Sequence, residues 1–192
     1  MIRPGEEDMM TVGDVVARRN LISVSGEPVL VPDPDQLVHL QFRRFAGCPI
    51  CNMHLRSIVM RHSEITAAGI REVVVFHSTE QELRQYEPDL PFAVIGDPGK
   101  ELYAEFGVGT SRTAVRNPAL LVHFPAIGWN FIRGIITGRR RPPPRNPTGG
   151  PLGRPADLLI APDGRVIAAK YGEHAYDQWA VDELLTHARP AP

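Results

Sequence analysis

The pattern of apolar positions predicts alternating strands and helices up to about residue 107. Glu72-Val-Val-Val-Phe76 is almost continuously apolar and β-branched, which is typical of a strand covered on both faces. Other short apolar runs bounded by turn residues predict a strand on either side of it in the chain. The three strands are expected at 37–43, 72–76 and 91–95.

Helical periodicity fills the segments that follow these strands. The first helix is expected to end at Gly69, because glycine commonly follows the last turn of a helix. Ser78 and Gln81, three residues apart, form a capping-box pattern that would begin the second helix. A strand–helix order of this kind predicts a mainly parallel sheet with right-handed crossovers. The second and third helices are expected at 80–86 and 100–106.

The last part of the chain predicts an antiparallel hairpin and a helix. Pro162-Asp163-Gly164 has turn chemistry and separates apolar runs at 156–160 and 165–170. A final amphipathic helix is expected over about 177–189. A β-α-β unit followed by a β-β-α unit, with two cysteines after the first main strand, is the thioredoxin fold. This is an α/β architecture with a central mixed sheet flanked by helices.

Two segments lie outside this framework. Residues 1–36 are interpreted as an N-terminal leader with one short helix or turn near 11–19, which leaves 37–189 as the thioredoxin-like domain. Residues 110–150 are interpreted as an insertion into that domain. The first part of the insertion is apolar and aromatic, and suggests a helical lid, a dimer surface or a wall of the substrate pocket. Its second part is a basic proline-rich loop.

Charge and composition narrow the range of functions. The chain has 21 Lys and Arg against 22 Asp and Glu, so nothing points to nucleic acid or a membrane surface. The acidic N-terminus does not resemble a secretory signal, and no apolar run is long enough to span a membrane. A length of 192 residues suggests one elaborated domain. We therefore expect a cytoplasmic protein with no nucleic-acid or membrane partner.

Cys48-Pro49-Ile50-Cys51 holds both cysteines and lies between a predicted strand and a predicted helix. The helix N-terminus carries unsatisfied N–H groups and about half a positive charge, which favours a thiolate at Cys48. Pro49 suits the first helical turn because its missing N–H costs nothing there. Cys51 shares the helix face and is within reach of a disulfide. Cys48 is expected at the exposed tip of the helix and Cys51 at the start of the buried stripe, which suits an attacking Cys48 and a resolving Cys51.

Other uses of two cysteines fit less well. A zinc site would need His54 and His62 as further ligands, all four from one continuous helix. Haem attachment requires a histidine where the chain has Asn52. A purely structural disulfide would close a very short loop and stabilise little, and an inert pair of buried thiols is a further alternative. Paired cysteines without an export signal favour reversible thiol chemistry, and no cofactor or metal is expected.

The segments that carry a family resemblance are Phe45-Ala-Gly-Cys-Pro-Ile-Cys-Asn-Met-His-Leu-Arg56, Phe76-His-Ser78, Asp89-Leu-Pro-Phe-Ala-Val-Ile-Gly-Asp97, Leu102-Tyr-Ala-Glu-Phe-Gly107, Pro155-Ala-Asp-Leu-Leu-Ile-Ala-Pro-Asp-Gly164 and Tyr171-Gly-Glu-His174. Together they resemble the peroxiredoxin-like proteins of the alkyl hydroperoxide reductase/thiol-specific antioxidant (AhpC/TSA) superfamily. The resemblance covers most of residues 25–188 and is loose over 110–150.

The resemblance implies a peroxidatic role for Cys48, whose thiolate would attack a peroxide oxygen and become a sulfenic acid. Cys51 would condense with it to a disulfide, which an external thiol would reduce. Two positions depart from the family pattern. Phe45 stands where a Thr or Ser hydroxyl is usual. Pro155 stands where an arginine is usual, with Arg154 one residue early.

Both departures move the site toward thioredoxin-like chemistry, in which a cis-proline packs against the CxxC motif. Pro155 is the candidate for that proline. Arg56 is a candidate for holding a thiolate or an anionic substrate, although a solvated arginine is the commoner case. Asp157 is a candidate acceptor of the proton of the buried cysteine, or a hydrogen-bonded structural residue. His77 is a weak pocket candidate.

Three functions stay open from the sequence. Peroxide reduction is favoured by the family resemblance, and thiol–disulfide exchange is favoured by Phe45 and Pro155. The third is a non-catalytic interaction module that uses residues 110–150. The first two need a peroxide or disulfide substrate. They also need an external reductant, either a thioredoxin-like protein or a low-molecular-weight thiol. A homodimer also stays open.

Overall fold

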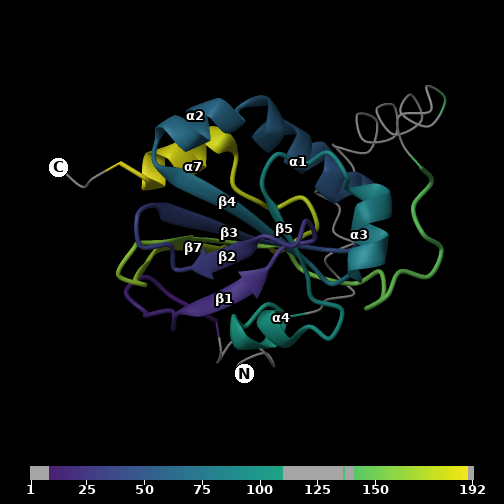
Figure 1. Cartoon of the computed structure of the whole chain (residues 1–192), viewed down its shortest axis with the longest axis horizontal. Helices are drawn as coiled ribbons and strands as arrows, with labels where there is room; N and C mark the ends of the chain where they lie inside the picture. Colours follow the sequence, from purple (N-terminus) through teal and green to yellow (C-terminus); the bar gives the residue numbers. More distant parts are fainter. Residues whose placement is uncertain (1–8, 110–135, 137–140, 190–192) are drawn as a thin grey trace.

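The computed structural model describes residues 9–109, 136 and 141–189, which fold around a central five-stranded sheet (Figure 1). The named elements are, in chain order, β1 Arg19–Ile22, β2 Pro28–Val31, β3 Leu37–Arg43, α1 Pro49–Met60, α2 His62–Ala67, β4 Ile70–Phe76, α3 Glu80–Tyr86, β5 Ala93–Gly96, α4 Glu101–Glu105, β6 Ala156–Ile160, β7 Val166–Tyr171 and α7 Val181–His187.

The sheet has the order β5-β4-β3-β6-β7 and is mixed. β3, β4 and β5 are parallel neighbours, whereas β6 runs antiparallel to β3, and β7 runs antiparallel to β6. The expected order of a parallel β-α-β part and an antiparallel hairpin is therefore confirmed. β3 is the central strand. The chain leaves its carboxyl end and, after a short segment, enters α1.

The elements pack in three layers (Figure 1). On one face of the sheet, α1, α2 and α7 contribute Ile58, Ile65 and Leu184 to a buried cluster with residues of β4, β6 and β7. Leu83 of α3 joins Leu55 of α1 in a second cluster on that face. The opposite face is covered by the β1–β2 hairpin and by α4.

β3 is buried on both faces, but the two faces differ in chemistry. Val38, Leu40 and Phe42 belong to the cluster that β1, β2 and α4 cover. The alternate residues are polar and fully buried on the side of α1 and α7, because successive side chains of a strand point to opposite faces. These polar residues are His39, Gln41 and Arg43.

Two details of the helices differ from the expectations. The helix after the cysteines is interrupted at Arg61, which has φ −116° and separates α1 from α2. The capping box of α3 is formed by Thr79 and Glu82, one residue later than expected. Ser78 instead accepts a hydrogen bond from the Ala46 N–H through its hydroxyl, so it ties the end of β4 to the segment that leads into α1.

The described N-terminal residues form a turn near Thr11 and the β1–β2 hairpin. Val29 and Val31 of β2 are buried in the cluster beneath the sheet. Most of the expected insertion, residues 110–135 and 137–140, lies outside the described residues. Residues 141–150 contain neither helix nor strand.

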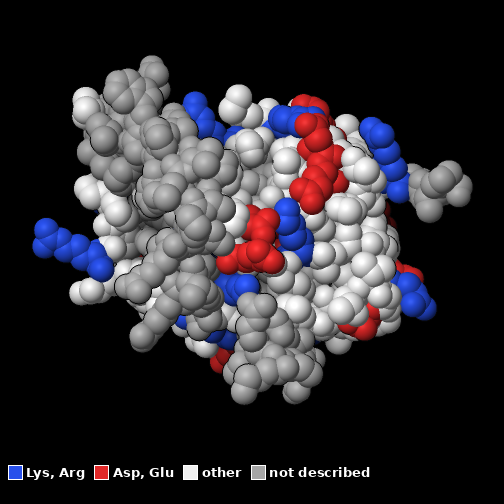
Figure 2. Space-filling view, turned by 180° about the vertical axis from the view of Figure 1, so that it is seen from behind, with Lys and Arg blue, Asp and Glu red and all other residues white. Residues whose placement is uncertain are grey.

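Charged side chains of both signs lie next to each other on the described part of the face in Figure 2. This mixture agrees with the near balance of acidic and basic residues in the chain. Among the described residues, no helix has the length and apolar character needed to cross a membrane.

Candidate active site

The two cysteines lie at the start of α1, directly after β3 and a short turn. Cys48 is the N-cap residue with extended backbone angles, and Pro49 is the first helical residue. The Cys48 carbonyl accepts a hydrogen bond from the Asn52 N–H at 2.9 Å, and the Cys48 N–H donates to the Phe45 carbonyl at 3.1 Å. These hydrogen bonds therefore fix the backbone of Cys48 at the start of the helix.

Gly47 makes the turn before the motif sterically feasible. Its φ is +77°, and a Cβ at this position would lie 2.7 Å from Cδ1 of Tyr86. Its N–H donates to Glu87 Oε1 at 2.9 Å. The loop after α3 is thereby held against the start of α1.

Both cysteines are buried and reduced, with exposed fractions of 1% for Cys48 and 0% for Cys51. The expectation of an exposed Cys48 at the helix tip is therefore wrong. The cause is tertiary packing, because Phe45 and Ala175 form an apolar cluster with both cysteines. Helical periodicity could not reveal this cover, since Ala175 follows the last strand of the sheet.

The surroundings favour a thiolate at Cys48. Burial would raise the pKa of its thiol, but hydrogen bonds from the Cys51 thiol and from the Ile50 and Cys51 N–H groups outweigh that effect. With the Arg44 charge they lower the pKa of Cys48 to about 6. The pKa of Cys51 lies well above its ordinary value, because its thiol proton is held by Cys48 and the group is buried. This asymmetry agrees with the roles expected from the helix position.

Arg44 is the site residue that the sequence analysis missed. Its Nη1 lies 3.6 Å from Cys48 Sγ, and its Nη2 donates to the Pro151 carbonyl. Its guanidinium carbon lies 5.3 Å from the centre of the Phe45 ring. The available signal was the Arg43-Arg44 pair at the end of β3, where two neighbouring arginines must point to opposite sides.

Pro155 and Arg154, the candidate residues directly before β6, do not have the roles expected of them. The one cis peptide bond among the described residues is Val31–Pro32, so the bond before Pro155 is trans and Pro155 is not the expected cis-proline. Trans is the usual state of X–Pro bonds. The Pro155 carbonyl accepts a hydrogen bond from the Gly172 N–H, which extends the pairing of β6 and β7. Arg154 donates its backbone N–H to the Gly109 carbonyl, and its Nε has no hydrogen-bond partner among the described residues.

Phe45 packs against the two sulfurs, and its side chain is 7% exposed. The position next to Cys48 where the family resemblance implies a hydroxyl therefore holds an aromatic ring. A ring supplies no hydrogen-bond donor to a sulfur or to a peroxide oxygen. Among the described residues, two side chains donate to the Cys48 sulfur. The Cys51 thiol is a neutral donor, and the Arg44 guanidinium is the charged one.

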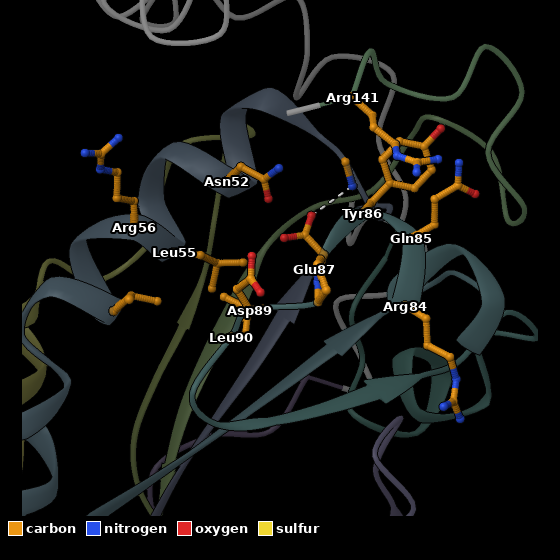
Figure 3. A pocket seen from close by; sticks show the side chains of 13 residues that line it. Asn52, Leu55, Arg56, Arg84, Gln85, Tyr86, Glu87, Asp89, Leu90 and Arg141 are labelled. Atoms are coloured by element: carbon orange, nitrogen blue, oxygen red, sulfur yellow. Dashed lines mark hydrogen bonds between the residues drawn. The ribbon is translucent and has the colours of Figure 1, made fainter. Parts of the chain in front are cut away.

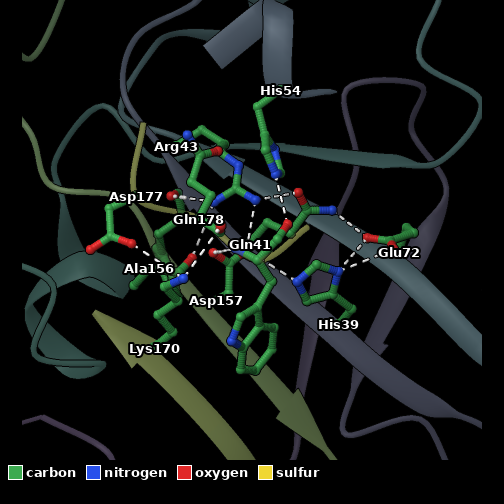
Figure 4. A network of polar contacts seen from close by, with 12 residues as sticks. His39, Gln41, Arg43, His54, Glu72, Ala156, Asp157, Lys170, Asp177 and Gln178 are labelled. Atoms are coloured by element: carbon green, nitrogen blue, oxygen red, sulfur yellow. Dashed lines mark hydrogen bonds and ion pairs between the residues drawn. The ribbon is translucent and has the colours of Figure 1, made fainter. Parts of the chain in front are cut away.

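Asp157 belongs to a buried polar network on the α1 face of the sheet (Figure 4). Its Oδ1 accepts from Arg43 Nη2 at 2.6 Å and lies 3.1 Å from His39 Nε2. His39 Nδ1 lies 2.9 Å from Glu72 Oε2, and the Trp179 N–H donates to Asp157 Oδ2 at 3.3 Å. The network crosses three neighbouring strands and bonds to the segment before α7.

The charges of this network are mutually compensating. Burial alone would raise the pKa of Asp157, but Arg43 and His39 hold it well below its usual range. Burial would lower the pKa of His39, but Glu72 and Asp157 raise it to about 9. A carboxylate held this way is a weak base, so these contacts favour the structural alternative for Asp157 over proton transfer from a cysteine.

Two buried histidines near the site, His54 and His77, are neutral near pH 7. His54 has a pKa lowered to about 4 by burial and by Arg43, and its Nε2 donates to the Trp179 carbonyl at 2.8 Å. His77 is buried with no hydrogen-bond partner for either ring nitrogen, and burial and Lys100 lower its pKa to about 4. His62 begins α2 instead of continuing α1. No group of three metal-binding side chains occurs among the described residues.

Arg56 is exposed on α1, one turn beyond Asn52, and lines a cavity beside Gly47. It makes no contact with a sulfur among the hydrogen bonds of the described residues. The structure therefore brings Cys48, Cys51, Phe45 and Pro49 together. It leaves Arg56 at the margin and places Arg154 and Asp157 in other contacts.

Comparison with known proteins gives one family and one fold. A family model described as AhpC/TSA antioxidant enzyme matches residues 57–174, which is more than half of the chain. The matched segment begins after Cys51, so both cysteines lie outside it. None of the curated proteins matches the chain in sequence.

Three solved structures illustrate the fold. Peroxidoxin BcpB of Mycobacterium tuberculosis is 16% identical with a TM-score of 0.65, over 93% of this chain and 96% of that one. Peroxiredoxin 6 of Arenicola marina is 15% identical with a TM-score of 0.66, over 93% and 72%. A putative thiol:disulfide interchange protein DsbE of Chlorobium tepidum is 16% identical with a TM-score of 0.57, over 94% and 99%. At these identities the likeness shows the thioredoxin-like fold.

Proposed function

The chain belongs to the AhpC/TSA antioxidant enzyme family, and we propose that it reduces peroxides by cycling Cys48 and Cys51 between a dithiol and a disulfide. The observation that carries the proposal is the pairing of a buried Cys48, whose pKa is lowered to about 6, with the Arg44 guanidinium 3.6 Å from its sulfur. The thiolate is the nucleophilic form of cysteine. Because Cys48 is 1% exposed, the proposed reaction requires a small peroxide and a local opening of the side chains that cover the sulfur.

In the first step, the Cys48 thiolate attacks one oxygen of the peroxide. A sulfur–oxygen bond forms as the O–O bond breaks, so Cys48 becomes a sulfenic acid and the other oxygen leaves as water or an alcohol after it takes up a proton. Arg44 stabilises the negative charge that develops on the oxygens, which is the role of a preorganised cationic donor.

In the second step, Cys51 attacks the sulfur of the sulfenic acid. A sulfur–sulfur bond forms, and the hydroxyl group leaves as water. The Cys51 thiol already donates a hydrogen bond to Cys48, so the two sulfurs are placed for this reaction. An external thiol would return the disulfide to the dithiol.

Thiol–disulfide exchange is the second candidate function. The low pKa of Cys48 and the aromatic ring of Phe45 favour it, since neither depends on a peroxide. Burial of both sulfurs disfavours a folded protein disulfide as the substrate. The trans bond before Pro155 removes one of the two features that suggested this chemistry. The third candidate, an interaction module that uses 110–150, concerns residues that lie mostly outside the described part of the chain.

Intact-mass spectrometry after one equivalent of hydrogen peroxide tests the proposal. The natural protein should lose two hydrogens, which corresponds to one disulfide. Cys51→Ser should instead retain a sulfenic acid at Cys48, which a dione probe traps. Cys48→Ser should show neither the mass loss with peroxide nor the adduct with the dione probe. Persistent free thiols in the natural protein would contradict the proposal. Turnover of insulin disulfides faster than of peroxide would favour the second candidate.

A further inference from the structure

A polar cavity of about 540 Å³ lies beside the start of α1 (Figure 3). Gly47 and Asn52, which flank the two cysteines in sequence, form part of its wall. Leu55 and Val59 of α1 supply an apolar side, and the loop after α3 closes the opposite side. The cavity is thus adjacent to the redox motif, and its size is that of a small-molecule site.

Charged groups of both signs line this cavity from different elements. Arg56 extends from α1 on one side and Arg141 descends beside Tyr86 on the other, as Figure 3 shows. Asp89, from the loop after α3, lies between them in this view. None of these three side chains has an ion pair or hydrogen bond with another described residue, so their charges are available to a ligand.

The charge of Arg84, which also lines the cavity, is already paired. Arg84 Nη2 pairs with Glu80 Oε2 at 3.2 Å along α3, and Figure 3 shows its side chain directed away from Asp89. Arg84 therefore offers a matched arginine on the same cavity wall that does not need a ligand. The Asn52 amide adds a neutral donor and acceptor next to the motif.

We propose that this cavity binds the reductant of the Cys48–Cys51 disulfide as a short thiol peptide that carries carboxylates and an ammonium group. Arg56 and Arg141 pair with separated carboxylates, since guanidinium groups are suited to them. Asp89 pairs with the ammonium group. The inference rests on the proposed function, because it names the thiol that completes that cycle.

The chemistry uses two molecules of the thiol. The thiolate of the first attacks Cys48, the cysteine next to Gly47 in the cavity wall. A new sulfur–sulfur bond forms as the Cys48–Cys51 bond breaks, and Cys51 takes up a proton. The second thiol attacks the mixed disulfide and releases the peptide disulfide. Two thiols are oxidised and one protein disulfide is reduced. Because Cys48 is 1% exposed, the first turn of α1 must open locally during the exchange.

Stopped-flow reduction of the oxidised protein tests the kinetic part of this inference. Glutathione is the charged probe and β-mercaptoethanol the uncharged one, with rates corrected for the thiolate concentration of each. We expect the rate to saturate with glutathione and to rise linearly with β-mercaptoethanol. Arg56→Gln and Arg141→Gln should each lower the glutathione rate about two- to fivefold, the range of exposed ion pairs. Arg84→Gln should leave it within about 1.5-fold.

Equilibrium binding separates this inference from the proposed function. S-methylglutathione has no thiol, so its binding, measured by calorimetry, does not depend on redox activity. We expect it to bind the natural protein and to bind Arg141→Gln and Asp89→Asn more weakly, with Arg84→Gln unchanged.

Binding of S-methylglutathione by a protein that fails to form a disulfide with peroxide would overturn the proposed function and retain the charged site. The protein could instead form the disulfide but fail to bind S-methylglutathione, with every variant affecting glutathione and β-mercaptoethanol equally. That result would overturn the proposed binding cavity and retain the Cys48–Cys51 cycle. Efficient reduction by a thioredoxin that is insensitive to Arg56→Gln and Arg141→Gln, with no glutathione saturation, would also overturn it.

Discussion

Arg44 Nη1 lies 3.6 Å from Cys48 Sγ, although the two residues are separated by a complete turn between β3 and α1. The arginine leaves the end of the central strand, passes over the Phe45 ring and also donates to the Pro151 carbonyl. A cation therefore reaches the reactive sulfur from the N-terminal side of the motif. The family resemblance had implied an arginine from the late strand, where Pro155 now stands.

Replacement of Arg44 should impair the reaction with peroxide. Arg44→Gln removes the charge that helps to lower the pKa of Cys48 and to stabilise the developing oxyanion. We expect the second-order rate with hydrogen peroxide at pH 8 to fall by about a hundredfold, and less for Arg44→Lys. Stopped-flow measurements on Arg154→Gln provide the comparison. A larger loss for Arg154→Gln than for Arg44→Gln would contradict the assignment.

The reactivity of Cys48 should follow a single ionisation near pH 6. Its pKa is lowered to about 6, so roughly nine-tenths of Cys48 is thiolate at pH 7, and the thiolate fraction falls about tenfold per pH unit once the pH is well below 6. Absorbance at 240 nm and the rate of alkylation by iodoacetamide should show this midpoint in the natural protein. Cys51→Ala removes the thiol that donates to Cys48 and should raise the midpoint by about one unit. A midpoint near pH 8.5 in the natural protein would disagree with this site.

Phe45 should make peroxide reduction slower than the family pattern permits. Phe45→Thr introduces a hydroxyl beside Cys48 and should raise the second-order rate with hydrogen peroxide. In Phe45→Val the side chain has nearly the shape of threonine but no hydroxyl. The ratio of the rates of Phe45→Thr and Phe45→Val therefore isolates the effect of the hydrogen bond. We expect a ratio of about ten or more, since one such donor contributes on the order of a hundredfold in other sites. Equal rates would show that Phe45 does not limit the reaction.

Both substitutions of Phe45 should also cost stability. The ring is 7% exposed and packs against Cys48, Cys51 and Ala175. Loss of this packing should lower the free energy of unfolding by about 2–4 kcal/mol. Denaturant unfolding of Phe45→Thr and Phe45→Val therefore accompanies the kinetics, and only samples that are folded at the assay temperature are compared.

The His39–Asp157 network should make stability depend on pH in the alkaline range. The pKa of His39 is raised from 6.5 to about 9, so its protonated form stabilises the fold below pH 6.5, and this contribution is lost as the pH rises through 9. A shift of this size corresponds to about 3 kcal/mol. Asp157 acts oppositely: its pKa is lowered, so its contribution is present above about pH 4 and is lost on acidification.

The measurement is urea unfolding at pH 6, 7.5 and 9 in a Cys48→Ser/Cys51→Ser background. This background is needed because the lowered pKa of Cys48 gives the opposite dependence between pH 6 and 9. Stability should fall with pH in this background, and His39→Gln should flatten the slope. His187→Gln, at an exposed histidine of α7, is the matched control and should retain the slope. An unchanged slope in His39→Gln would remove His39 as its cause.

Replacement of Asp157 should be strongly destabilising. Asp157→Ala leaves Arg43 and His39 buried without their shared carboxylate, since Arg43 Nη2 lies 2.6 Å from Asp157 Oδ1. We expect a loss of about 3–5 kcal/mol in the free energy of unfolding. Lys170→Ala, which removes the surface ion pair with Asp177, should cost less than 1 kcal/mol. Comparable losses in the two variants would show that the network is not a main source of stability.

Local patterns in the amino-acid sequence were enough to predict the order of the elements and the place of the cysteines. Apolar periodicity and turn residues gave strands 37–43 and 156–160 and helix 80–86 with the bounds that β3, β6 and α3 have in the structure. These signals are local, since a strand alternates every two residues and a helix repeats every 3.6. The start of α1 at Pro49 follows from the same local rules.

The groups around the two sulfurs and the set of polar residues that are buried together could be known only from the folded structure. Cys48 is covered by Ala175 and contacted by Arg44, while His39, Glu72 and Asp157 meet across three strands. Such contacts join residues that are far apart in the sequence. They depend on the strand order and on the direction of each side chain, and a window of a few residues does not reveal either. A polar residue in a strand pattern has the same local appearance whether solvent or a buried carboxylate satisfies it. The physical reason is that the free energy of a charge depends on its three-dimensional neighbours.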